Sequence, residues 1–318
     1  MKNGRVYKVE SKDIYVIDDE GSEYRCSIRG RLKKSFNLKK DKLYNLDIAI
    51  VGDNVKFNEN NDGSGVIEDV ENRHNYISRK SPRIKGAGVR GERLEQVIAA
   101  NVDNLFIITS VYDPVFNNKL LDRLIVTGES SHIDINIIIN KVDLDEENLI
   151  EPWGALYENL GYSVILVSAE TGEGIEEIRE HLAESTSIFW GQSGVGKSSI
   201  LNSLYPELEF RVGDISDLHR KGKHTTVTAV MAEPEEGVRI IDTPGIREIE
   251  PFGIKKEDLG HYFVEFGDFL NQCKFNTCTH FHEPGCAVRD AVEDEEISVE
   301  RYESYLNMLE TIEDDINF

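Results

Sequence analysis

The sequence predicts a chain of three parts: a small β-barrel, a doubly wound α/β domain and a mostly helical C-terminal region with a metal site. Three observations support this prediction. Short strand patterns and turn signals fill residues 1–72, apolar strands alternate with helical patterns over 104–250, and a cysteine and histidine cluster follows. A length of 318 residues suits two or three domains.

Composition excludes several classes of protein. Mean hydropathy is −0.40 and no run of about 20 apolar residues occurs, so a transmembrane helix is not expected. The first residues lack the apolar segment of a secretory signal, and we expect a cytoplasmic protein. Four cysteines are too few for a disulfide framework, and three of them lie within residues 273–286.

The first part of the chain reads as a barrel of about five strands. Turn signals at 18–21 and 61–63 separate alternating apolar patterns. This density of strands favours an OB-type barrel, and an SH3-like barrel is the alternative. The expected strands cover 6–9, 14–17, 24–28, 48–51, 55–57 and 65–67.

Charge is distributed unevenly. The formal net charge is −23, which by itself argues against a nucleic-acid partner. Residues 25–42 nevertheless hold eight basic side chains and one acidic, while the acidic excess lies after residue 94. A basic linker is expected over 73–103. The early segments can therefore face phosphate. The linker's basic residues include Arg79, Lys80, Arg83, Lys85, Arg90 and Arg93.

Residues 104–250 have the pattern of a doubly wound sheet. Continuous apolar runs indicate strands buried on both faces, and the intervening segments have helical spacing. The expected strands are 105–108, 135–139, 164–167, 188–190 and 238–241, and the expected helices are 118–130, 146–160 and 174–184.

A phosphate-binding loop lies between one of these strands and a predicted helix. Residues 191–198 match G-x-x-x-x-G-K-[ST], and this context is the one that supports a P-loop. Lys197 would contact the β and γ phosphates, and the Ser198 hydroxyl would bind Mg²⁺. The loop consists of Gly191, Gln192, Ser193, Gly194, Val195, Gly196, Lys197 and Ser198.

Two other strand ends indicate which base is bound. Asn140-Lys141-Val142-Asp143 follows an apolar strand, at the edge where α/β sheets bind ligands. The Asp143 carboxylate can accept from N1–H and the 2-amino group of guanine, a donor pair that adenine lacks. Ser168-Ala169 ends the next strand and suits a contact from the Ala169 amide to guanine O6. We therefore expect GTP and GDP.

The γ-phosphate side of the site is predicted from two further segments. Asp242-Thr243-Pro244-Gly245 ends a strand, so Asp242 would hold Mg²⁺ through water and the Gly245 amide would sense the γ-phosphate. Thr225 or Thr226 would complete the Mg²⁺ shell when GTP is bound. The sequence does not choose between these two threonines.

The motif order is that of a circular permutation. In Ras-like GTPases the P-loop comes first, whereas here residues 140–143 and 168–169 precede it. The site can still assemble because the sheet depends on strand adjacency and not on chain order. One consequence is that the segment after Asp242 runs directly into the C-terminal region, where the nucleotide state could act on residues after 250.

Hydrolysis needs a group that orients the attacking water. Ile246 stands where Ras-like enzymes place a glutamine, and isoleucine cannot take that role. His224 lies beside the two threonines and is the candidate. The alternative that Ile246 favours is an RNA-binding module that holds GTP or GDP and hydrolyses little GTP.

The last motif predicts a structural zinc site. Cys273, Cys278, His280 and Cys286 supply three thiolates and one imidazole at short spacing. His282 could replace His280, and Glu283 and Asp290 are weaker candidates. Cys26 lies on an expected strand as a core residue.

With these motifs in place, the chain resembles the ribosome small-subunit-dependent GTPase A family over nearly its whole length. The resemblance rests on the permuted motif order together with the zinc spacing. The carrying segments are residues 96–103, 140–143, the P-loop through Ser199, 222–226, 242–245, 273–286 and Arg301-Tyr302-x-x-Tyr305.

The resemblance implies a domain order and a function. It implies an OB domain over 1–72, a permuted GTPase domain over 104–250 and a zinc domain over 251–318. It also implies GTP hydrolysis stimulated by the small ribosomal subunit, in late maturation of that subunit, with the OB and zinc domains contacting ribosomal RNA. His224 matches the family's switch histidine. We expect a monomer that binds GTP or GDP, Mg²⁺ and one zinc ion, without a membrane partner.

Overall fold

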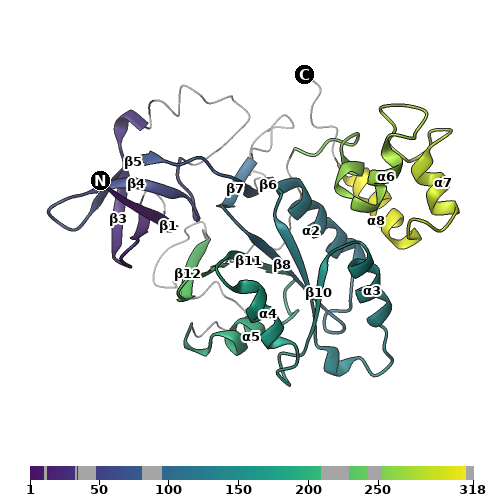
Figure 1. Cartoon of the computed structure of the whole chain (residues 1–318), viewed down its shortest axis with the longest axis horizontal. Coiled ribbons are helices and arrows are strands. Elements are labelled where there is room, and N and C mark those ends of the chain that lie inside the picture. Colours follow the sequence, from purple (N-terminus) through teal and green to yellow (C-terminus); the bar gives the residue numbers. More distant parts are fainter. Residues whose placement is uncertain are drawn as a thin grey trace, which may run out of the picture.

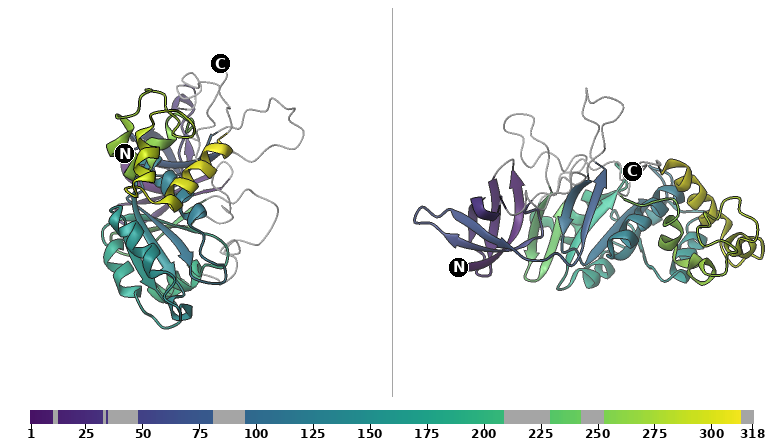
Figure 2. Two further views of the ribbon diagram at one scale, coloured as in Figure 1. Left: turned by 90° about the vertical axis from the view of Figure 1, so that its right-hand side faces the viewer. Right: turned by 90° about the horizontal axis from the view of Figure 1, so that it is seen from above.

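The computed structural model describes residues 1–10, 13–32, 34, 48–80, 95–208, 229–242 and 253–312. The barrel lies at one end of the molecule and the C-terminal helices at the other, with the α/β domain between them (Figure 1 and Figure 2). This arrangement confirms the predicted three-part architecture. None of the described helices has the length and apolar character needed to cross a bilayer.

The barrel is of the OB type. Strand β1 pairs with both β2 and β4, β2 pairs with β3, and a parallel β3–β5 pairing completes the ring with β4. Alternate side chains fill the interior, among them Val6, Val16 and Phe57. The strands are β1 (Lys2–Glu10), β2 (Asp13–Asp18), β3 (Glu23–Ile28), β4 (Asn54–Glu59) and β5 (Gly65–Val70).

The predicted strand over 48–51 is wrong. These residues form bends and a turn: Ala49 is buried in the barrel core, whereas Ile50 packs with Ala100 and Val51 packs into the core of the α/β domain. Gly52 has a φ of +92°, and a Cβ there would lie 1.9 Å from the carbonyl oxygen of Ala100. Ala100 donates its amide to Val51 at 3.0 Å. The apolar run over 48–51 therefore reflects burial between two domains and not the presence of a strand.

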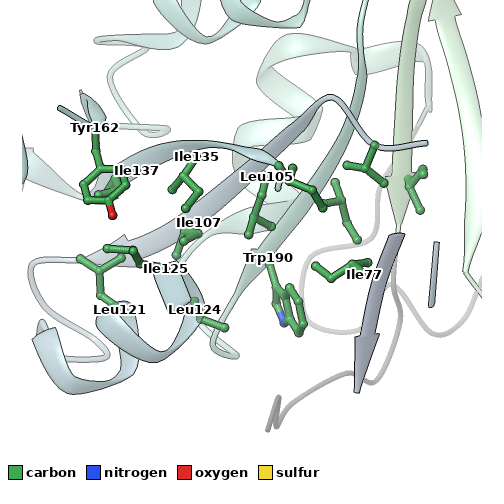
Figure 3. Packing of buried hydrophobic residues seen from close by; sticks show 14 of the residues in the cluster. Ile77, Leu105, Ile107, Leu121, Leu124, Ile125, Ile135, Ile137, Tyr162 and Trp190 are labelled. Atoms are coloured by element: carbon green, nitrogen blue, oxygen red, sulfur yellow. The ribbon is translucent and has the colours of Figure 1, made fainter. Parts of the chain in front are cut away.

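The segment expected as a linker contains two strands. β6 (Tyr76–Lys80) and β7 (Glu95–Ala100) form an antiparallel pair of their own. Ile77 of β6 packs into the central core near Trp190 (Figure 3). Hence this segment is partly built into the α/β domain.

The central sheet has the order β10-β9-β8-β11-β13-β12 and continues into the barrel through β12 and β1. Its strands are parallel except β12, which runs antiparallel to β13 and pairs with β1 at Lys8↔Val230. The bounds are β8 (Asn104–Ser110), β9 (Asp134–Asn140), β10 (Ser163–Val167), β11 (Thr186–Gly191), β12 (Val230–Glu235) and β13 (Val238–Asp242).

Helices cover both faces of this sheet. Neighbouring strand residues alternate between two cores: Ile107 packs with α2 and α3, while Phe106 packs with α4 and α5. Figure 3 shows the first core, where Leu121 and Ile125 of α2 face the strands. The helices are α2 (Asn118–Ser131), α3 (Glu151–Asn159), α4 (Ile175–Leu182) and α5 (Lys197–Leu204), and short 3-10 turns are η1 (Val142–Leu144) and η2 (Pro206–Leu208).

The C-terminal region is mostly helical, as predicted. Phe263, Phe266 and Tyr305 form its aromatic core, which also contains Val126 of α2. The last described helix is α8 (Val299–Thr311). The other elements are η4 (Leu259–Tyr262), η5 (Val264–Phe266), α6 (Gly267–Leu270) and α7 (Ala287–Glu293).

Candidate nucleotide and zinc sites

The predicted P-loop joins the end of β11 to the start of α5. Gly194 and Gly196 have φ values of +88° and +96°, which glycine adopts without steric cost. Gly196 immediately precedes Lys197, the first residue of α5. The loop therefore brings backbone N–H groups and the helix N-terminus to one place, which is the arrangement that binds phosphate.

Asn140 links the P-loop to the segment that follows β10. Its side chain is buried, and its Nδ2 donates to the carbonyl oxygen of Val195 at 2.7 Å. Its Oδ1 accepts from the amide of Ala169 at 3.1 Å. A Cβ at Gly196 would lie 2.1 Å from the same Nδ2, so only glycine leaves room for this contact. Three segments that the sequence places apart thus meet at one side chain.

The neighbours of Asn140 lie at the same sheet edge. Lys141 has a φ of +65°, and its ammonium donates to the carbonyl oxygen of Asp113. Asp143 lies in η1 with its side chain exposed. Ser168 is buried, and its hydroxyl accepts from the amide of Thr171 at 3.1 Å. This serine therefore shapes the loop that carries Ala169.

Lys197 and Asp242 lie at the P-loop end of the candidate nucleotide site. Burial lowers the pKa of the Lys197 ammonium, and the negative charge of Asp242 acts in the opposite direction. Asp242 is the last residue of β13, which pairs in parallel with β11, so it stands beside the P-loop strand. Ser198 is half-buried in the first turn of α5.

Four predicted site residues lie outside the described residues. They are His224, Thr225, Thr226 and Gly245, and Ile246 also lies outside. Their roles stay predictions.

The four predicted zinc ligands come together. Their candidate ligand atoms all lie within 4.8 Å of one another. His280 Nδ1 lies 3.4 Å from Cys286 Sγ and 3.6 Å from Cys273 Sγ, and the two sulfurs are 4.0 Å apart. Tetrahedral zinc with usual bond lengths requires about 3.5 Å between nitrogen and sulfur and about 3.8 Å between sulfurs. This donor set therefore fits a closed zinc site with no open position.

The choice between the two histidines falls on His280. It is buried with a φ of +55°, whereas His282 is exposed. Gly260 packs against its ring, since a Cβ there would lie 3.1 Å from His280 Nε2. Sequence reasoning missed this glycine, because nothing local links it to a histidine twenty residues away.

Glu283 is an organiser of the zinc loop and not a ligand. Burial disfavours its charge, but hydrogen bonds from Thr279, from its own amide and from His282 outweigh this and lower its pKa to about 2. Its Oε1 accepts from the Thr279 hydroxyl at 2.6 Å. The ionised carboxylate therefore holds the turn on which His280 lies.

Sequence reasoning also missed the segment over 111–117, between β8 and α2. Besides Asp113, it brings Pro114 within 3.6 Å of the position that a Cβ on Gly194 would occupy. The available signal was its place at the carboxyl end of a parallel strand, where α/β sheets bind ligands.

Similarities to known proteins agree with this geometry. A family model described as RsgA GTPase matches residues 70–252. The chain is 44% identical over 272 residues to the small ribosomal subunit biogenesis GTPase RsgA of Chlorobaculum parvum, covering 84% of this chain and 86% of that protein. It is 40% identical over 315 residues to the protein of the same name from Chlorobaculum tepidum, covering 98% of each.

Two solved structures are similar over nearly the full length. The crystal structure of YjeQ from Thermotoga maritima has 35% identity and a TM-score of 0.76, with 98% of each chain covered. That of YloQ, described as a circularly permuted GTPase, has 28% identity and a TM-score of 0.71, covering 100% of this chain and 97% of that one. The permuted motif order, the zinc cluster and these similarities lead to one conclusion: this chain is a GTPase that belongs to the RsgA GTPase family.

Proposed function

We propose that this GTPase hydrolyses GTP to GDP and phosphate in late maturation of the small ribosomal subunit, and that this subunit stimulates it. The observation that carries the proposal is the junction at Asn140, which joins the P-loop to both base-reading segments. Relatives that are 44% and 40% identical to this chain bear the name of small ribosomal subunit biogenesis GTPases, which supports the choice of partner.

The base would be read by two groups at this junction. The Asp143 carboxylate accepts from guanine N1–H and the 2-amino group. The Ala169 amide, already directed at Asn140 Oδ1, donates to guanine O6 as a second acceptor. Adenine presents an acceptor at N1 and a donor at its 6-position, so both contacts fail for ATP.

The phosphates would be held by the P-loop. Its backbone amides from Gly191 to Ser199 surround them, and Lys197 neutralises charge between the β and γ phosphates. Ser198, Asp242 and Thr225 or Thr226 would hold Mg²⁺, which when bound neutralises charge on the phosphate oxygens. His224 would orient the water that attacks the γ-phosphate in line, because Ile246 cannot.

Two groups of residues outside the nucleotide site would serve binding to the ribosome: the zinc ligands and the basic segments near the N-terminus. Cys273, Cys278, His280 and Cys286 would hold a zinc ion that stabilises the C-terminal domain. The basic residues over 25–42 and 73–93 would supply most of the contacts to ribosomal RNA. The domains would cover 1–72, 104–250 and 251–318, joined by 73–103, in a cytoplasmic monomer.

The test is the GTPase rate of the full chain with purified small subunits, with large subunits and with neither, each at two salt concentrations. We expect strong stimulation by small subunits alone, which decreases at high salt because phosphate contacts release counterions. Lys197→Ala is the control for the site: it should abolish the stimulated rate.

Two outcomes would contradict the proposal. Equal stimulation by both subunits would argue for another RNA or protein partner. No stimulation in any condition, with tight GDP binding, would favour a nucleotide-holding RNA-binding module. Co-sedimentation with small subunits, in the presence of a non-hydrolysable GTP analogue, separates loss of subunit binding from loss of turnover.

A further inference from the structure

A buried ionic cluster lies outside both sites, where α2 of the GTPase domain meets α8 of the C-terminal region. The Arg301 guanidinium is fully buried. Its Nε and Nη2 donate to Glu265 Oε1 and Oε2 at 2.6 and 3.1 Å, and its Nη1 donates to Asp122 Oδ1. The Tyr157 hydroxyl donates to the same Asp122 oxygen at 2.8 Å. The cluster thus joins α2, α3 and two segments of the C-terminal region.

The cluster is suited to fixing the position of α8 relative to α2. Burial lowers the pKa of Arg301, but Asp122 and Glu265 outweigh this effect and the net direction is upward, so the guanidinium stays charged. A buried ion pair adds little stability over apolar packing of the same volume, whereas leaving one partner unpaired is strongly unfavourable. Any sliding of α8 along α2 would break the paired geometry. One relative position of the two helices is therefore strongly preferred.

From α8 the contacts continue to the zinc loop. The Tyr302 hydroxyl donates to the carbonyl oxygen of His280 at 2.7 Å, and the Tyr305 hydroxyl donates to that of Thr279 at 2.6 Å. Tyr305 also shares an apolar core with Cys278 and Cys286. The helix that carries Arg301 thus holds the backbone of a zinc ligand.

From α2 the contacts continue to the nucleotide site. The segment 111–117 leads directly into α2, and Asn117 caps the helix by accepting from the amide of Leu120. The segment is closed by a 3.1 Å hydrogen bond from the Phe116 amide to the carbonyl oxygen of Val111. It places the carbonyl oxygen of Asp113 against the ammonium of Lys141. In Figure 1, α2 lies between the sheet and the C-terminal helices.

We propose that the Asp122–Arg301–Glu265 cluster couples the zinc domain to the guanine end of the nucleotide site through α2 and the segment 111–117. This proposal rests on the proposed binding of guanine nucleotide. Asp122 and Arg301 are positioning residues: they lie outside the proposed nucleotide and zinc sites, and act by setting where α2, and with it Asp113, stands relative to Lys141. The contacts along this route all belong to residues that the structure describes. The route is distinct from the chain connection that follows Asp242.

Coupling between two sites is reciprocal. If zinc strengthens GDP binding by some factor, GDP must strengthen zinc binding by the same factor. Coupling between sites commonly amounts to about 5–150-fold. In the folded chain, a cluster that only stabilises the fold leaves this factor at one.

The first experiment uses the full-length wild-type chain. GDP affinity is measured by titration with a fluorescent GDP analogue, with and without bound zinc. Zinc affinity is measured by competition with a chelator, with and without saturating GDP. We expect both affinities to increase by the same factor, of at least about fivefold.

The second experiment compares two variants. Asp122→Asn removes the negative charge of Asp122 but keeps the shape of the side chain. We expect the factor by which GDP and zinc strengthen each other's binding to fall towards one. Glu303→Gln is the matched control, because Glu303 pairs with Lys119 across the same two helices at 3.6 Å but is exposed. The control should keep the wild-type factor. If Asp122→Asn fails to fold, Arg301→Lys keeps the charge without the two-pronged geometry, and the same loss of coupling is expected.

The outcomes separate the two proposals. GDP and zinc that bind independently in the wild type would overturn the coupling, while leaving the GTPase proposal intact. Coupling that persists in both cluster variants would also overturn it and would assign the effect to another route. No binding of GDP at all would contradict the proposed function itself, and with it this inference.

Discussion

The side-chain amide of Asn140 donates a 2.7 Å hydrogen bond to the backbone carbonyl of Val195. Val195 belongs to the P-loop, and Asn140, 55 residues earlier in the chain, ends strand β9, which leads to Asp143, the aspartate proposed to read the base. The proposed phosphate and base halves of the site are therefore joined directly by a hydrogen bond within the protein. A direct contact of this kind limits the ordering that nucleotide binding requires.

Asn140→Ala should weaken GDP binding. The substitution leaves the carbonyl of Val195 and the amide of Ala169 without their partner, at a cost of about 1–3 kcal/mol for each buried group. We expect the Kd for GDP to increase by roughly tenfold or more, measured by fluorescence titration. Asn136→Ala is the control, because Asn136 is also buried on β9 but bonds Asn104 at 3.3 Å. Equal effects of both substitutions would show that Asn140 acts only through the fold.

Gly196→Ala should disrupt the same junction from the other side. The new Cβ would lie 2.1 Å from Asn140 Nδ2, and the φ of +96° adds strain. Gly161→Ala isolates the strain, since Gly161 has a φ of +93° with no atom within 4 Å of its Cβ position. Both variants should lose about 1–2 kcal/mol of unfolding free energy from the backbone. GDP affinity should fall only in Gly196→Ala, and a normal affinity there would contradict the close packing.

Binding of GDP should weaken in alkaline solution because of Lys197. Burial lowers its pKa in the free protein, and bound phosphates would raise it again. Binding therefore takes up a proton between these two pKa values, and affinity falls as pH rises through that window. The measurement is the Kd for GDP between about pH 7 and pH 10, below the usual lysine pKa.

Lys197→Arg is the comparison for this pH dependence. Its guanidinium stays charged over the whole range, whereas guanine loses its N1 proton in both proteins. The wild type should show the steeper loss of affinity with pH. Parallel pH profiles would remove Lys197 ionisation as the cause.

Replacement of the two neighbouring histidines should have opposite outcomes. His280→Ala removes the imidazole whose Nδ1 faces Cys273 and Cys286, so bound zinc should be lost and the C-terminal domain should melt at a lower temperature. His282→Ala should keep a full complement of zinc. The measurement is metal content by elemental analysis together with thermal unfolding. Retention of zinc in His280→Ala would require a different ligand set.

Asp53→Ala should loosen the barrel from the GTPase domain. Asp53 is fully buried, accepts from Arg73 Nε and Nη2 at 2.7 and 2.8 Å, and also accepts from the Ile50 amide. Loss of one partner of a buried ion pair costs about 3–5 kcal/mol. Glu71→Gln is the control, since Glu71 pairs with Lys56 at an exposed position, where a pair contributes less than about 1 kcal/mol.

The measurement for this pair of variants is the free energy of unfolding in urea. The Asp53 variant should unfold at a clearly lower urea concentration than the Glu71 variant. Similar midpoints for the two would show that the Asp53–Arg73 pair does not hold the joint together.

The motifs were predictable because each is a short-range property. The P-loop needs only a strand, glycines at fixed positions and a helix start, and the zinc ligands lie within fourteen residues. Their order along the chain revealed the permutation directly. The barrel strands followed from alternation and turn signals. Residues 48–51 misled because burial against a second domain produces the same apolar run as a strand.

What only the tertiary structure decided are relationships between distant residues. Arg301 and Asp122 are separated by 179 positions, and no local pattern pairs them. His280 and His282 have the same side chain two residues apart, and only packing against Gly260 and Phe266 turns the first inward. The sequence by itself determined the family, the nucleotide motifs and the zinc-binding residue types, because these depend on residue identity and spacing. The tertiary structure decided which side chains meet, because that depends on how buried surfaces of separate elements fit together.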